Sequence, residues 1–197
     1  HIKSTKMRAK INLLFILFGL ITILLSCNLN QKNREREELV RDYYNGFNTG
    51  DYGLISNTVC DSIKITEKEY ILTRTRNELQ RQFQWDSVFS PKYSLVDLKI
   101  KGNSAEVTIS KICKRIAFLQ DSALVYNVLI DFDGDKISEI QTTEYVFLDF
   151  LKWRPRRDNL TNWINENHPE LAGFVSTQSV EGAQNYLIAI DLYKTEK

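Results

Sequence analysis

An acidic hairpin is the segment whose residue types most directly suggest ion binding. Asp131, Asp133 and Asp135 alternate with other residues in the sequence DFDGD, and calcium-binding EF-hand loops begin with the same spacing. Such a loop needs glycine at its sixth position and glutamate at its twelfth, whereas Gly134 is fourth here and Thr142 is twelfth. A tight two-residue turn explains the pattern, and no metal site is predicted.

Cysteine and histidine are too few and too widely spaced to indicate a metal site. The chain has three cysteines and two histidines, and His168 is the only histidine after the first residue. Zinc-binding cysteines usually come in close pairs, which are missing from this sequence. Cys60 and Cys113 could form a disulfide in an oxidising compartment, or they could remain two buried apolar thiols. Both possibilities stay open, and no cofactor is predicted.

The first 27 residues have the layout of an export signal. Met7, Arg8 and Lys10 form a positive region, which an almost purely apolar run from 11 to 25 follows. The run is shorter than the roughly 20 residues of a membrane-spanning helix, so a plain membrane anchor is the weaker alternative. The closing residues LLSC resemble a bacterial lipobox. This resemblance implies that Cys27 is lipidated, for example with palmitate, and that the protein is lipid-anchored at the bacterial cell envelope.

The charge distribution argues against nucleic acid as a partner. Residues 28–197 carry 22 basic and 25 acidic side chains, because four of the 26 lysines and arginines precede residue 11. A slightly acidic body lacks the positive field that phosphate binding uses. The one basic stretch, WRPRR at 153–157, is predicted to be solvated turn surface.

The first part of the folded body is predicted to be helix, strand, helix. After a polar tether at 28–33, a helix at 34–48 presents an apolar stripe of Leu39, Val40, Tyr43, Tyr44 and Phe47. Gly50 ends this helix, and Asp51 caps a short second helix through Ser56. Alternation predicts a strand at 59–66, and the helical period predicts a helix from 67 to about 83.

The later part of the body is predicted to be an antiparallel sheet followed by helices. Strands are expected at 93–101, 105–118, 124–132 and 136–147, with a hairpin turn at 133–134. Because the helices precede the strands, an α+β fold is predicted. The remaining residues, 149–197, are predicted to be a helical extension, with helices at 158–167 and 180–194 that cover the outer face or an edge of the sheet.

The order of elements, with the signatures FNTGD and DSIKI, resembles the NTF2-like superfamily, in particular its SnoaL-like and ketosteroid-isomerase-like branches. The resemblance covers residues 34–148. It implies a cone of curved sheet, closed by the N-terminal helices, around an apolar pocket. Tyr44, Phe47, Val125 and Leu129 are the expected lining residues of that pocket. The alternate side chains of the same strand, Tyr126, Val128 and Ile130, would then form an outer face through which two copies could pair.

The same resemblance implies a candidate catalytic trio. Ketosteroid isomerases place a tyrosine, an acid and a second donor at positions that correspond here to Tyr43, Glu67 and Asn127. A carboxylate in an apolar cavity can act as a base while a phenol and an amide stabilise a developing oxyanion. Packing alone would equally explain Tyr43 on its apolar stripe, and the helix dipole would explain Glu67 at a helix start.

Two functions follow from these observations. The leading hypothesis is a lipid-anchored envelope protein that binds a small apolar ligand or a protein partner without catalysis, since no convincing nucleophile or metal set is present. The alternative is an enzyme in which Glu67 moves a proton next to a carbonyl held by Tyr43 and Asn127.

Overall fold

A computed structural model describes residues 30–197, of which Leu39–Lys197 form one compact unit. The whole of the predicted signal, with the predicted lipidation site Cys27, lies outside the described residues. Residues 30–49 are helical, so the helix begins within the predicted tether. Within residues 30–197, no helix is both long enough and apolar enough to cross a membrane.

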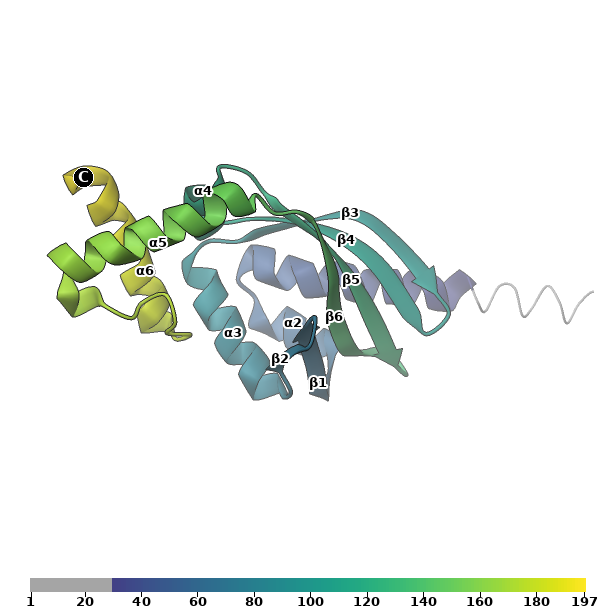
Figure 1. Ribbon diagram of the computed structural model, residues 1–197. Coiled ribbons are helices and arrows are strands. Elements are labelled where there is room, and N and C mark those ends of the chain that lie inside the picture. The colour runs from purple at the N-terminus through teal and green to yellow at the C-terminus, as the bar shows by residue number, and fades with distance from the viewer. Residues whose placement is uncertain (1–29) are drawn as a thin grey trace, which may run out of the picture. The chain divides into compact units, whose positions relative to one another are not determined.

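One curved sheet of six strands organises the compact unit (Figure 1). Its order is β2-β1-β6-β5-β4-β3, and neighbouring strands are antiparallel except β1 and β6, which run parallel. The predicted α+β fold is therefore present, with one parallel pair that the meander did not predict. The strands are β1 (Val59–Glu67), β2 (Tyr70–Thr73), β3 (Lys92–Lys101), β4 (Ser104–Ile112), β5 (Leu124–Asp133) and β6 (Lys136–Phe147).

Two helices, α2 (Tyr52–Thr58) and α3 (Arg76–Val88), lie on the concave side of the sheet (Figure 1). As predicted, Asp51 caps α2, because its carboxylate accepts a hydrogen bond from the Leu54 amide at 3.1 Å. The turn before α2 is tight, since a Cβ on Gly46 would meet Ile55 at 2.4 Å. The first helix and α2 therefore pack closely enough to exclude any side chain at that position.

The main core lies between these helices and the inner, concave face of the sheet. Val128 and Ile130 of β5 are almost fully buried in it, and Tyr126 packs against it. The prediction that these three side chains form the outer face is wrong. Both faces of β5 carry apolar residues, so the alternation alone did not distinguish them. A dimer through the outer face stays a prediction, and it would use the opposite set of side chains.

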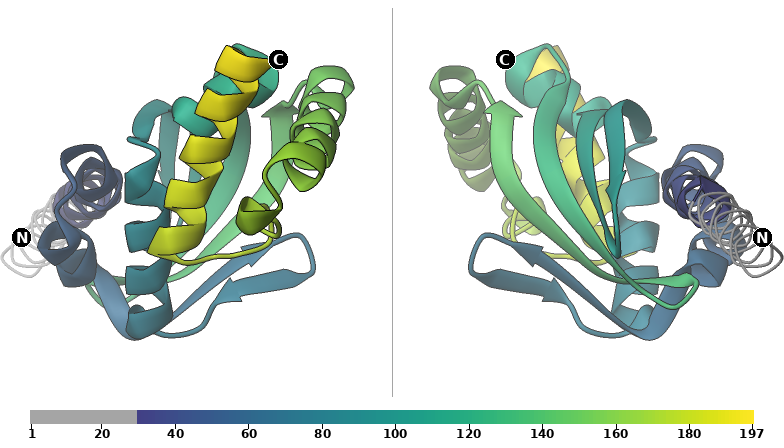
Figure 2. Two further views of the ribbon diagram at one scale, coloured as in Figure 1. Left: turned by 90° about the vertical axis from the view of Figure 1, so that its left-hand side faces the viewer. Right: turned by 90° about the vertical axis from the view of Figure 1, so that its right-hand side faces the viewer.

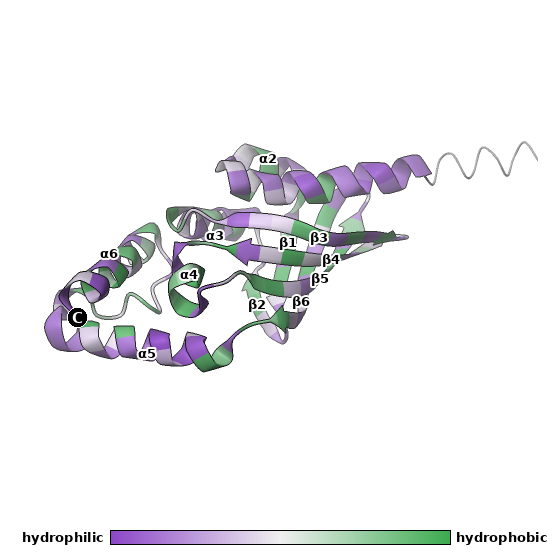
Figure 3. Ribbon diagram, turned by 90° about the horizontal axis from the view of Figure 1, so that it is seen from above, coloured by the Kyte–Doolittle hydropathy of each residue, from purple (hydrophilic) through white to green (hydrophobic). Residues whose placement is uncertain are grey.

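Three helices build a second core at one end of the sheet (Figure 2). They are α4 (Lys114–Gln120), α5 (Phe150–Asn167) and α6 (Val180–Glu196), with a short 3₁₀ turn, η1 (Pro169–Leu171), between the last two. Their main contacts are with α3 and with one another, so the extension does not lie mainly on the outer face of the sheet. In Figure 3, α5 is largely hydrophilic but apolar at its start, where Phe150 and Leu151 are exposed.

Three local predictions are wrong. The expected helix at 67–83 is a hairpin, in which β2 follows β1, and then α3. The expected strand at 105–118 ends at Ile112, because the Cys113 side chain caps α4. The WRPRR stretch lies inside α5 and not in a turn. In the first two cases an apolar segment fits two periods, and the tertiary contacts determine which one forms. In the third, the helix includes Pro155, which local pattern assigns to a turn.

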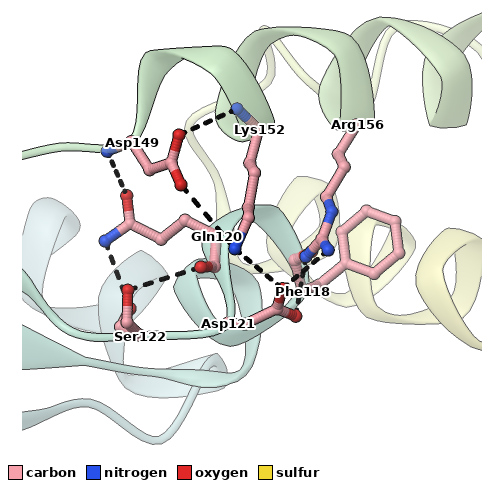
Figure 4. Close-up of polar contacts among 7 residues, drawn as sticks. All are labelled: Phe118, Gln120, Asp121, Ser122, Asp149, Lys152 and Arg156. Atoms are coloured by element: carbon pink, nitrogen blue, oxygen red, sulfur yellow. Dashed lines mark hydrogen bonds and ion pairs between the residues drawn. The ribbon is translucent and has the colours of Figure 1, made fainter.

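An ion pair joins the end of α4 to α5. Asp121 adopts a left-handed backbone (φ 63°) after α4, and Arg156 of α5 donates to both of its carboxylate oxygens at 2.7 and 2.6 Å (Figure 4). Arg156 also donates to the Phe118 carbonyl at 3.0 Å, which is a free carbonyl of the last turn of α4. Part of the basic stretch therefore joins two helices.

The two cysteines of the described part are both free. Cys113 is buried, and its sulfur accepts from the Ile116 amide at 3.5 Å. Cys60 lies partly exposed in β1. Of the two open possibilities, the structure therefore shows separate thiols.

Candidate ligand-binding site

The structure places the predicted pocket residues of the first helix in the main core. Tyr43, Tyr44 and Phe47 are each at most 6% exposed. Their rings pack edge to face, with centroids 5.1 Å apart for Tyr43 and Tyr44 and 5.5 Å apart for Tyr43 and Phe47. These rings pack in the core against the inner face of the sheet, so little of their own surface is left for a ligand.

Asn127 lies on the other side of the sheet from the main core. Its side chain accepts from the Thr108 hydroxyl at 2.8 Å and donates to the exposed Glu144 at 3.4 Å. The flanking residues Val125 and Leu129 share its face by the alternation of the strand. The structure therefore separates Asn127 from Tyr43, and the three residues do not face a common pocket.

Glu67 does meet a phenol, but it is not that of Tyr43. The Tyr145 hydroxyl, from β6, donates to the Glu67 carboxylate at 2.5 Å. This contact joins the end of β1 to the end of β6. Of the predicted trio, the structure thus brings none together, and it gives Glu67 a partner that the sequence did not suggest.

The inner-facing side chains of β5 are partly accessible at one end of the strand. Along β5, Val128, Ile130 and Phe132 are buried, whereas Tyr126 is only partly buried. Its cross-strand neighbour Tyr145 is also partly buried. With Tyr93 of β3, which is partly buried as well, these side chains form a group that we call the phenol cluster (Tyr93, Tyr126 and Tyr145). The cluster marks the end of the inner face nearest to the second core.

A buried ion pair contacts Tyr93 of the phenol cluster. The Asp86 carboxylate of α3 is 4% exposed and accepts from Lys111 Nζ at 2.7 Å. Its second oxygen accepts from the Tyr93 hydroxyl, also at 2.7 Å. Lys111 also lies over the Tyr93 ring, 4.7 Å from the centroid. The two charges and the phenol therefore satisfy one another, which is the condition under which buried charges are tolerated.

The phenols of this region are neutral hydrogen-bond donors. Burial raises the pKa of Tyr93 and Tyr126 well above the usual value of 10, and the negative charge of Asp86 raises both further. Burial also raises the pKa of Tyr145, and its hydrogen bond to Glu67 adds to the effect. Loss of water is the largest cause at each position, although each residue as a whole is only partly buried. The Tyr93 and Tyr145 hydroxyls already donate to Asp86 and Glu67, so these oxygens can only accept a hydrogen bond from a bound molecule. The cluster cannot supply a phenolate base.

A groove of about 590 Å³ lies apart from the phenol cluster, between α4, α5 and α6. Basic and aromatic residues dominate its lining, and its arginine is held by the Asp121 contact of Figure 4. Phe118 and Tyr193 meet edge to face in the groove, 6.0 Å apart. This groove is open to solvent along the helices, and we regard it as a secondary site.

The sequence analysis missed the residues that support the cluster. Asp86 and Lys111 are charged residues in otherwise amphipathic elements, and such residues are usually solvated. The available signal was the alternation of β4, where Val107, Ile109 and Lys111 share one face. A lysine in register with two core residues implies a buried partner, but the identity of that partner depends on α3.

The architecture defines a class of fold, and solved structures with a similar fold are known. A protein of unknown function from Methylobium petroleophilum, described as having a cystatin-like fold, matches with a TM-score of 0.50 and 17% identity over 59% of this chain and 79% of that chain. An NTF2-like protein from Cytophaga hutchinsonii matches at 0.44 and 10%, over 54% and 87%. A Kribbella flavida protein named as a candidate ketosteroid isomerase matches at 0.47 and 13%, over 59% and 83%.

These likenesses concern the fold alone, because the identities are low. The predicted fold class, α+β with a curved sheet covered by N-terminal helices, is confirmed by the architecture, which matches the cystatin-like fold of the Methylobium petroleophilum protein. No protein-family model and no curated protein matches the sequence. Functions on this scaffold depend on individual residues, so the function must be argued from the site.

Proposed function

We propose that the protein binds a small, largely apolar molecule at the phenol cluster, without converting it chemically. The observation that carries this proposal is the partial accessibility of Tyr93, Tyr126 and Tyr145, in contrast to the buried residues Val128, Ile130 and Phe132 farther along β5. Aromatic rings offer apolar contact, and their hydroxyl oxygens can accept directional hydrogen bonds. That combination is typical of small-molecule sites.

Calorimetry with 1-octanol tests the proposal on the protein from Asn28 onward. Tyr126→Trp adds bulk at the cluster and is expected to weaken octanol binding by at least about tenfold. Asn127→Ala is the matched control, because it changes the adjacent residue on the opposite face and should leave the affinity unchanged. Absence of binding, or equal loss in both variants, would contradict the proposal.

We also propose that this body is held at the bacterial envelope by lipid on Cys27. The support is the sequence layout of residues 7–27, which the described residues do not include. Cells grown with labelled palmitate should label the protein, and Cys27→Ser should abolish the label and move the protein out of the membrane fraction. Label that survives the substitution would remove the anchoring proposal and leave the ligand proposal intact.

Proton transfer is the second candidate function, and the contact between Glu67 and Tyr145 favours it. A carboxylate held 2.5 Å from a neutral phenol could exchange a proton with a substrate beside the cluster. Proton exchange on model enones, measured for the wild type and for Glu67→Gln, separates this candidate from binding alone. Equal rates in the two proteins would remove it.

A further inference from the structure

Arg115, near the start of α4, occupies an aromatic box in the second core. Its guanidinium carbon lies 5.1 Å from the ring centroid of Trp85 and 5.7 Å from that of Phe89, both near the end of α3. From the other side, Trp153 of α5 and Tyr186 of α6 approach to 5.6 and 6.0 Å. Aromatic faces attract a cation, but they give its N–H groups no hydrogen-bond acceptor.

Two polar atoms in this box are poorly satisfied. Arg115 Nε and the Tyr186 hydroxyl are both buried and form no hydrogen bond of good geometry, and Tyr186 is only 3% exposed. Arg115 lies near enough to the Tyr186 hydroxyl to lower its pKa against the larger effect of burial, so the arginine is the polar neighbour of this phenol. Over residues 30–197, no ion pair engages Arg115, although Lys111 pairs with Asp86 nearby. The side chain as a whole is partly exposed, so it remains open to an incoming group. A buried polar group left unsatisfied is costly, and two together in one box are unusual in a native fold.

The box adjoins the phenol cluster. Arg115 lies over the ring of Trp85 in α3, and its positive charge lowers the pKa of Tyr145, against the larger effect of burial. Trp85 of the box is the immediate chain neighbour of Asp86, which binds Tyr93 of the cluster. A molecule on the cluster would thus have its end near Arg115.

We propose that Arg115 and Tyr186 bind the carboxylate of the ligand whose apolar body contacts the phenol cluster. The proposal rests on the proposed function, and it identifies the ligand class as an apolar carboxylic acid in its ionised form. A carboxylate matches the planar donor fork of arginine and supplies the acceptor oxygens that the box lacks. The aromatic rings exclude water and thereby strengthen the charge pair.

Binding of octanoate and of 1-octanol, compared by calorimetry, tests this assignment. The two probes share their alkyl chain and differ in charge. The wild-type protein is expected to bind octanoate at least about tenfold more tightly than octanol, which is the usual advantage of a charge-assisted hydrogen bond. Arg115→Gln should abolish this preference while leaving octanol affinity unchanged, and Tyr186→Phe should reduce it in part. The Trp85 and Trp153 fluorescence provides an independent readout, because both rings flank the site.

Lys114→Gln is the matched control, since it removes the same charge from the preceding, exposed residue of α4. This control should keep the full preference for octanoate. Equal affinity for the two probes in the wild type, or a preference that survives Arg115→Gln, would overturn the assignment while the proposed binding function stands. If neither probe binds, both proposals fail. If Arg115→Gln unfolds the protein, Arg115→Lys decides, because it keeps the charge and should retain part of the preference.

Discussion

The two cores of this protein treat buried polar groups in opposite ways. In the main core, Asp86, Lys111 and Tyr93 satisfy one another at distances of 2.7 Å. In the second core, Arg115 Nε and the Tyr186 hydroxyl are buried without a well-formed hydrogen bond, and the two side chains have mainly each other as polar neighbours. The first arrangement stabilises a fold, because every charge has its counterpart. The second leaves binding capacity unused, which is what a site for an external anion requires.

Alkaline pH should cause the largest loss of stability, and most of the tyrosines responsible lie in or against the main core. Burial raises the pKa of Tyr43, Tyr44, Tyr93 and Tyr126 above the usual value of 10, so the folded state keeps protons that the unfolded chain releases above that pH. Stability is therefore complete below pH 10 and is lost as the pH rises toward the folded-state values. Each of these phenols should lower the free energy of unfolding by about 1.4 kcal/mol for every pH unit above 10, up to its folded-state pKa. Urea denaturation at pH 9, 10 and 11 measures this, and a flat profile would contradict it.

Breaking the paired charge of the main core should have the next largest effect. Asp86→Asn leaves Lys111 buried without a counter-charge, and we expect a loss of about 3 kcal/mol in the free energy of unfolding. The double variant with Lys111→Met removes both charges and should recover much of that loss. A single variant as stable as the wild type in urea would show that the pair is not desolvated.

Removing one hydroxyl from each core sharpens the comparison. Tyr93→Phe deletes a donor that the Asp86 carboxylate uses, so it should cost about 1–2 kcal/mol. Tyr186→Phe deletes an unpartnered hydroxyl and should be neutral or stabilising. Both are measured by urea denaturation without ligand. Equal losses for the two variants would mean that the Tyr186 hydroxyl is satisfied in solution.

The ion pair of Figure 4 should give the smallest effect. Arg156 lowers the pKa of Asp121 through its hydrogen bonds, but both groups are solvated. Asp121→Asn keeps a residue that tolerates the left-handed backbone and removes only the charge. The urea midpoint should barely move, and any difference should shrink further in 1 M salt. A shift as large as that of Asp86→Asn would contradict this view.

Local pattern predicted many of the elements correctly but several boundaries incorrectly. The expected strand at 136–147 coincides with β6, and the Asp51 cap begins α2 as predicted. The helix predicted at 67–83 was wrong because a two-residue turn at Lys68, with φ of 54°, allows a hairpin that the apolar spacing did not reveal. Short segments fit both periods, and only strand pairing with β1 distinguishes them.

The candidate site was less predictable than the fold. Counting along the chain proposed Tyr43, Glu67 and Asn127, whereas the structure gathers Tyr126 and Tyr145 on the accessible inner face. The choice of face for β5 was reversed, and that single error exchanged the lining residues with those of the outer surface.

The amino-acid sequence by itself determined the fold class, the order of most elements and the candidate lipid-bearing Cys27, since these depend on composition and on neighbours within a few residues. The tertiary structure alone decided which face of β5 turns inward, which charges are paired and which are left open. The reason is that Trp85, Arg115, Trp153 and Tyr186 come from four different helices. Their contact exists only after the chain has closed long loops, and no short-range pattern records it.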